Sequence, residues 1–134
     1  MGNLSRFIRE HFLPSKIDYP EKTNHFEIYQ IKPTPDARKC MYMNLSMIDR
    51  MGYVLSKDIY TLVYTDIIKN VDKLSTRVFL EDIFTKFNLD RPRNFRGRSM
   101  SVSDIIVMYI NGEKTTYYVD GSDFARLPND FWET

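Results

Sequence analysis

Apolar residues recur along this chain with two different periods, and the shorter period predicts strands. Residues 26–32, FEIYQIK, alternate in side-chain direction, and residues 58–68, DIYTLVYTDII, are rich in β-branched and aromatic residues. Residues 101–109 form a third apolar run, and the Asn111-Gly112 pair after it is a strong signal for a tight hairpin. Residues 114–120, KTTYYVD, should then return as its partner strand. We therefore predict a mainly antiparallel sheet.

The longer period marks the clearest helix of the chain, over residues 76–88. Ser75 or Thr76 is the candidate cap at its start. Five apolar residues fall on one face of this helix: Val78, Leu80, Ile83, Phe84 and Phe87. We expect this face to pack on one side of the sheet, which makes the fold class α+β.

A shorter amphipathic helix is predicted over residues 4–13, where Pro14 stops the pattern. The polar residues after it read as a linker. We expect an N-terminal helix and linker over residues 1–24 and one α+β domain over residues 25–134. The apolar face of the N-terminal helix must fold back on the domain, exchange with a second copy to form a dimer, or dock on another protein.

The segment from Cys40 to Gly52 and the C-terminal tail are assigned from weaker signals. Residues 40–45, CMYMNL, alternate like a strand and lead into a short helix, for which Ser46 is the candidate cap and Gly52 the candidate end. The pattern of this segment admits both helix and strand. The four methionines of this segment fill the core or form an adaptable interface: Met41, Met43, Met47 and Met51. Phe131 and Trp132 near the C-terminus should dock on the core.

Composition agrees with one globular domain and narrows the functional classes. The chain has 134 residues, of which 43% are hydrophobic and 28% charged, and its net charge of +1 gives no global attraction to nucleic acid or membrane. Cys40 is the single cysteine, which excludes an internal disulfide and predicts a buried, inert thiol. No signal peptide or membrane span is recognisable, so we expect a cytoplasmic protein with no membrane partner.

Positive charge is concentrated in one loop, between the helix at 76–88 and the strand at 101–109. Four arginines fall within eight residues that contain no acid: Arg91, Arg93, Arg96 and Arg98. Such a loop could bind phosphate or an acidic protein surface. Alternatively, the loop is a solvated turn whose arginines pair with acids such as Asp90 and Asp104.

Two uncharged residues of the same loop admit a structural interpretation. Phe95 offers a ring for stacking, but within a polar loop it is the better candidate for an anchor in the core. Gly97 is expected to supply a turn with a positive φ angle.

The chain offers no complete catalytic constellation. Ser101 and Ser103 lack a neighbouring base, because both histidines, His11 and His25, lie in or beside the N-terminal segment. Ser103 and Asp104 are therefore expected to accept hydrogen bonds from backbone donors of the turn before the strand. The scattered acids, cysteine and histidines do not form a recognised metal-ligand spacing. We expect no enzymatic activity, no metal and no cofactor.

Residues 80–128 contain five short motifs: Leu80-Glu81-Asp82-Ile83, Phe87-Asn88-Leu89-Asp90, Phe95-Arg96-Gly97, Ser101-Val102-Ser103-Asp104 and Tyr117-Tyr118-Val119-Asp120. In these motifs the chain resembles the YodL-like domain family, which occurs in proteins of bacterial conjugative elements and phages, and the likeness extends over roughly residues 26–131. The resemblance implies a genomic setting, mobile elements, and not a particular activity. Members of the family usually carry histidine where this chain has Arg98, so a role for that histidine as base or ligand does not transfer.

The residues and the resemblance lead us to expect a non-enzymatic accessory protein of a phage or mobile element. It would bind and inhibit a host defence factor through protein contact; an anti-CRISPR that binds a defence nuclease or its complex is one form of this expectation. The expected contact residues are Arg91, Arg93, Arg96, Arg98 and Phe95. The alternative is a nucleic-acid-binding regulatory module in which the same arginines contact phosphates.

Overall fold

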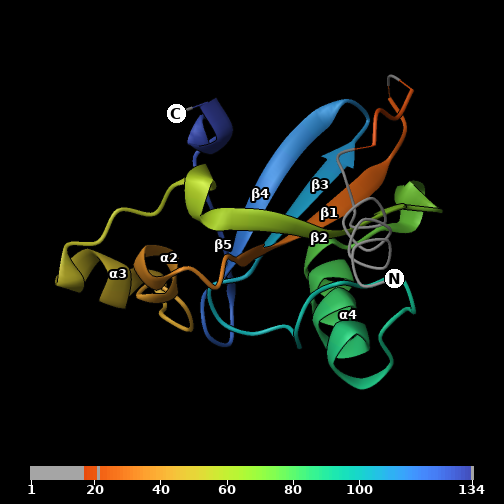
Figure 1. The fold of residues 1–134 in the computed structure, drawn as a ribbon. Helices are drawn as coiled ribbons and strands as arrows, with labels where there is room; N and C mark the ends of the chain where they lie inside the picture. The colour runs from red at the N-terminus through yellow and green to blue at the C-terminus, as the bar shows by residue number, and fades with distance from the viewer. Residues whose placement is uncertain (1–16, 21, 134) are drawn as a thin grey trace.

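The structure, a computed structural model, describes residues 17–20 and 22–133 (Figure 1). The helix predicted over residues 4–13 lies outside the described residues. Five strands form one sheet in the order β2-β1-β3-β4-β5, and every neighbouring pair is antiparallel. The strands are β1 (His25–Ile31), β2 (Tyr60–Ile67), β3 (Ile105–Ile110), β4 (Glu113–Val119) and β5 (Phe124–Arg126). The prediction of an α+β fold with an antiparallel sheet is confirmed.

The predicted hairpin is present between β3 and β4. Ile110 pairs with Glu113, and the two residues between them have positive φ angles, 51° at Asn111 and 83° at Gly112. Asparagine and glycine tolerate this conformation, which matches the twist of the flanking strands. β3 begins later than predicted, at Ile105, because residues 101–104 form a turn in which Ser103 has a φ of 86°. The three-residue strand β5 was not predicted.

One face of the sheet packs on α4 (Thr76–Leu89). Phe26 and Ile28 of β1 share this core with Ile106 and Met108 of β3. From the helix, Leu80, Ile83 and Phe87 are buried, and Phe84 is partly buried against them. Ser75 caps the helix by accepting a hydrogen bond from the Val78 backbone N–H. The prediction that Val78 belongs to the buried face is wrong, since it is 53% exposed.

The opposite face is also covered, which the prediction of a single packed helix did not include. Here Ile31, Ile105, Val107 and Tyr118 of the sheet form a second core with the helices α2 (Pro35–Arg38) and α3 (Leu45–Met51). Figure 1 shows α2 and α3 grouped at one end of the molecule and α4 at the other. Three short 3-10 helices complete the described chain: η1 (Lys57–Ile59), η2 (Val71–Lys73) and η3 (Phe131–Glu133). The sheet is therefore buried on both sides.

The segment before α3 forms turns, so the strand-like reading of residues 40–45 is wrong. Asn44, not Ser46, caps α3: its side chain accepts a hydrogen bond from the Met47 N–H at 2.8 Å. Gly52 ends the helix in the left-handed conformation, as predicted. The cap lies one residue before the first helical residue, where a short polar side chain reaches the free N–H groups of the first turn. The alternation of apolar residues in the sequence does not show where this position falls.

Two packing predictions are confirmed. Phe131 is buried and Trp132 donates its indole N–H to the Thr116 hydroxyl at 2.8 Å, so the tail docks on the sheet. Cys40 is buried in the second core, and burial raises the pKa of its thiol. Among the described residues, the helices are too short or too polar to cross a bilayer.

Candidate functional site

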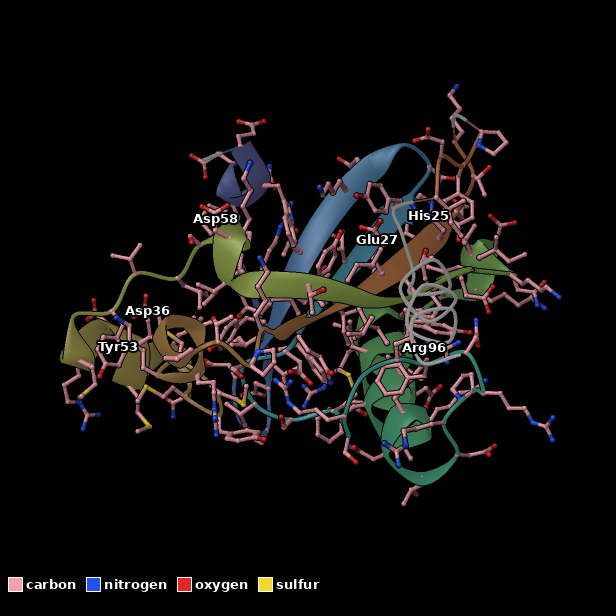
Figure 2. All side chains as sticks on the ribbon, viewed as in Figure 1. His25, Glu27, Asp36, Tyr53, Asp58 and Arg96 are labelled. Atoms are coloured by element: carbon pink, nitrogen blue, oxygen red, sulfur yellow. The ribbon has the colours of Figure 1, made fainter. Side chains whose placement is uncertain are left out.

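The arginine loop, residues 90–104, connects α4 to β3 and runs from α4 towards α2 and α3 (Figure 1). Arg91, Arg93 and Arg96 have exposed side chains. In Figure 2, Arg96 lies beside α4, at the opposite end of the molecule from Tyr53. Its guanidinium donates a hydrogen bond to the Arg93 carbonyl at 3.4 Å. The loop therefore presents three of its four cationic groups to solvent.

None of these three arginines forms an ion pair with an acid within the described part of the chain. The predicted pairing with Asp90 is not observed, although Asp90 is the first residue of the loop and directly follows α4. Unpaired guanidinium groups retain their capacity for bidentate bonds to carboxylate or phosphate. The exposed arginines are therefore available to a partner.

Phe95 anchors the loop in the core beneath α4. Its side chain is only 8% exposed, and its ring packs edge-to-face on Phe87 and Tyr64, with centroid distances of 4.9 Å and 6.3 Å. The next residue, Arg96, donates its backbone N–H to the Val63 carbonyl in β2 at 3.3 Å. Val63 is the extra residue of a β-bulge, because β1 pairs Ile28 with Tyr64 and Tyr29 with Leu62. Phe95 thus supports the loop and presents little surface to a partner.

Gly97 is required for close packing and not for a positive φ angle, so the prediction of a left-handed turn is wrong. A Cβ atom at this position would collide with the Gln30 side-chain oxygen and would lie 2.8 Å from Cζ of Phe95. Glycine is the residue that lets the loop backbone approach both side chains.

Gln30 of β1, buried at 1% exposure, fastens the loop to the sheet. Its Oε1 accepts a hydrogen bond from the Arg98 N–H at 3.0 Å, and its Nε2 donates to the Arg98 carbonyl at 2.8 Å. Nε2 also donates to Oδ2 of Asp104 at 3.0 Å. These three bonds form what we call the Gln30 latch. Sequence reasoning missed it because a glutamine in an alternating strand is typical of a solvent-facing position.

Arg98 differs from the other three arginines. Its Nη1 donates to the Ile31 carbonyl at 3.2 Å, and its Nη2 lies 3.9 Å from Oδ1 of Asp104. The Arg98 side chain is 32% exposed, whereas Asp104 is fully buried. The predicted pairing with Asp104 is therefore observed for Arg98, whose guanidinium is directed inwards. Of the four arginines, Arg98 supports the loop that carries the other three.

Asp104 accepts from a backbone donor of the turn before β3, as predicted, whereas the Ser103 hydroxyl accepts from a distant segment and not from that turn. Asp104 Oδ2 accepts from the Ser101 N–H at 2.9 Å, and the Ser103 hydroxyl accepts from the Tyr42 N–H at 3.0 Å. The Ser103 carbonyl also accepts from the Tyr60 hydroxyl at 2.7 Å. These bonds connect the loop to both the α2–α3 segment and β2.

Burial raises the pKa of Asp104 from its ordinary value of 3.8 to about 7, although the Ser101 N–H, Gln30 and Arg98 oppose the rise. The folded state therefore holds the proton more tightly than the unfolded state does. The binding of this proton adds to the free energy of unfolding, and the contribution is fully present below about pH 4. It decreases as the pH rises, and at about pH 7 the decrease amounts to at most about 4 kcal/mol.

We expect Asp104→Asn to remove this pH dependence, because an amide does not titrate. The measurement is the free energy of unfolding in urea at pH 5.0 and pH 7.5 for both proteins. On going to pH 7.5, the wild type should lose about 2 kcal/mol or more relative to the variant, since other titrating groups are common to both and cancel. An unchanged difference between the two proteins would contradict the role assigned to Asp104.

The predicted absence of a serine–histidine pair holds for the described histidine, His25. β1 and β3 pair His25 with Tyr109 at one end of the ladder and Tyr29 with Ile105 at the other, so His25 is remote from Ser103. The His25 ring is stacked between Tyr19 and Tyr109, at 4.1 Å from each, and its Nδ1 lies 2.8 Å from the Thr23 carbonyl. The arrangement of His25 is that of a packed side chain that fixes the residues before β1.

The methionines of the Cys40–Gly52 segment divide into two pairs. Met41 and Met43 pack partly buried against the second core, whereas Met47 and Met51 of α3 are 41% and 53% exposed. Core filling therefore accounts for the first pair only.

A sequence model described as the YodL-like domain matches residues 25–131 of the chain. Comparison with curated proteins gives no match, and neither does comparison with solved structures. The matched span runs from the first residue of β1 to the first residue of η3, so it includes the whole sheet and the arginine loop.

Proposed function

We propose that this chain, which belongs to the YodL-like domain family, acts by protein contact and without enzymatic activity, as an accessory protein of a phage or mobile element that inhibits a host defence factor. The observation that carries the proposal is the arginine loop itself. Arg91, Arg93 and Arg96 are exposed and free of acid partners among the described residues, on a backbone fastened by buried groups. The genomic setting rests on the family resemblance.

The construction of the loop supports binding because it lowers the entropic cost of association. Phe95 in the core and the Gln30 latch hold the backbone on both sides of Arg96. A loop that is ordered before binding loses less freedom when a partner arrives. An acidic patch on the partner would then meet three guanidinium groups already in position, and inhibition would follow from occlusion of that patch.

Two observations favour a protein partner over nucleic acid. Proteins that bind single strands commonly use exposed rings for base stacking, but the ring of Phe95 is buried in the core. The chain also has a net charge of only +1, which gives little long-range attraction to a polyanion. Nucleic acid is therefore the less favoured partner, and the test below includes it.

The test compares two variants that lose the same charge. One replaces Arg91, Arg93 and Arg96 with alanine, and the matched control replaces Lys69, Lys73 and Arg126, which are also exposed. Each immobilised protein is incubated with extract of the bacterium that carries the element, and captured proteins are quantified by mass spectrometry. We expect the loop variant to lose its main captured protein by about tenfold or more, while the control retains it.

Equal capture by the two variants would overturn the role of the arginine loop. A parallel titration uses a 30-nucleotide single strand at 50 mM and 200 mM salt. Tight binding that weakens steeply with salt, and that only the loop variant loses, would replace the protein-contact proposal with the nucleic-acid alternative.

A further inference from the structure

Exposed apolar side chains gather around α3. Tyr42 lies just before the helix, Met47 and Met51 lie on it, and Val54 follows it, with exposed fractions of 59%, 41%, 53% and 80%. Met47 and Met51 are four residues apart, so they share one face of the helix. The other exposed large apolar residues of the described chain are separated along it: Ile17, Ile67, Val78 and Leu89. We call Tyr42, Met47, Met51 and Val54 the α3 patch.

Tyr42 is held in a conformation that an aromatic residue rarely adopts. Its φ angle is 69°, in the left-handed region, and its N–H is fixed by the Ser103 hydroxyl at 3.0 Å. Ser103 itself has a φ of 86°. Backbone strain of this kind costs about 1–3 kcal/mol and recurs at functional sites. Here the constrained backbone carries an exposed ring, which is a suitable anchor residue for an interface.

The α3 patch is joined to the arginine loop through Arg98. The guanidinium carbon of Arg98 lies 6.0 Å from the centroid of the Tyr42 ring, and Arg98 is two residues from the exposed Arg96. The bond between Tyr42 and Ser103 adds a second connection between the two segments. A rearrangement of either segment would therefore disturb the other.

The charges around the α3 patch indicate the chemistry of its partner. The exposed charged residues of α2, α3 and the turn between them are Asp36, Arg38, Lys39, Asp49 and Arg50. Bases exceed acids in this set, and Arg98 adds a further cation beside Tyr42. Flexible methionines adapt to the shape of an apolar partner surface, while the surrounding cations favour carboxylates.

We propose that the α3 patch is a docking surface for a protein segment that carries apolar side chains flanked by carboxylates, on the same partner that the arginine loop contacts. This inference rests on the proposed function and extends it. Tyr42 would enter an apolar pocket of the partner, and Met47 and Met51 would cover the rim of that pocket. The arginine loop would contact acids further along the partner surface.

The test uses variants that separate binding from folding. Tyr42→Gly removes the ring and relieves the left-handed strain, so it should unfold at the same temperature as wild type or higher. Met51→Glu adds an acid to the patch, and Val78→Glu makes the same change at an equally exposed apolar residue near the start of α4, away from the arginine loop. The protein that wild type captures, and the loop variant does not, is purified and titrated against each variant.

We expect Tyr42→Gly and Met51→Glu each to raise the dissociation constant by about tenfold or more, and Val78→Glu to leave it within about twofold. Photo-crosslinking from p-benzoylphenylalanine at position 42 should label a partner peptide with apolar and acidic residues. Wild-type affinity in both patch variants would overturn the inference. A crosslink only to a second copy of this chain would also overturn it, by making the patch a self-association surface.

The two proposals fail in different ways. If the loop variant loses binding and Tyr42→Gly binds as tightly as wild type, the arginine loop remains the proposed contact. The inference about the α3 patch is then overturned. If every captured protein binds equally well without Arg91, Arg93 and Arg96, the proposed function is overturned. A crosslink from position 42 to an acidic partner segment would in that case support the patch alone.

Discussion

Gly97→Val should destabilise the domain by about 3 kcal/mol or more, or prevent its folding. The first carbon of the new side chain would overlap the Gln30 side-chain oxygen and lie 2.8 Å from Cζ of Phe95. Neither neighbour can move away easily, because Gln30 is bonded at both ends of its amide and Phe95 is packed against Phe87 and Tyr64. Overpacking alone typically costs about 1–3 kcal/mol, and the displaced amide would lose its hydrogen bonds as well.

The measurement is urea unfolding followed by the fluorescence of Trp132, the single tryptophan of the chain. Ser99→Val is the matched control, since it places the same branched side chain two residues later, at an exposed position of the loop. It should shift stability by less than about 1 kcal/mol. A stable Gly97→Val protein would mean that the loop does not approach β1 as closely as the structure places it.

Gln30→Leu is expected to have the second largest effect, a loss of about 3–4 kcal/mol. Leucine has nearly the volume of glutamine but makes none of the three bonds of the latch. The Arg98 N–H, the Arg98 carbonyl and Asp104 Oδ2 would each lose a partner. Each buried polar group left without a bond costs about 1–3 kcal/mol. Asp104 Oδ2 keeps its bond from the Ser101 N–H, and the partial exposure of Arg98 to water reduces the sum further.

Hydrogen exchange at single amides separates loss of the latch from general destabilisation. In Gln30→Leu, the Arg98 amide should exchange at least about tenfold faster, in excess of the global change in stability. The Ser101 amide, which donates to Asp104, should follow the global change only. Equal acceleration of both amides would show that Gln30 does not hold the loop locally.

Regular elements of this fold were predictable because their causes are local. β-branched and aromatic residues account for β1 and β2, the Asn111-Gly112 pair fixes the hairpin, and helical periodicity marks α4. The short elements were not predictable in the same way. α3 begins at a cap set by Asn44, and the alternation of Cys40 to Leu45 is compatible with several backbones.

The candidate site was predicted as a set of charges but not as a structure. The sequence shows four similar arginines, yet only Arg98 is directed inwards. Its guanidinium contacts the Ile31 carbonyl, which is distant in the sequence, and Asp104, which is near in the sequence. Gly97 is explained by Gln30, which lies 67 positions earlier in the chain. Such roles depend on which strands become neighbours, and no short-range pattern of residues records that.

The bond between Arg96 and Val63 has a consequence for solubility. β2 is an edge strand of the sheet, and an edge strand can recruit a strand from another molecule and begin aggregation. The bulge at Val63 distorts this edge, the arginine loop occupies a carbonyl group there, and the cations beside it repel a second copy. We therefore expect the same loop to hinder the pairing of β2 with a strand of a second copy.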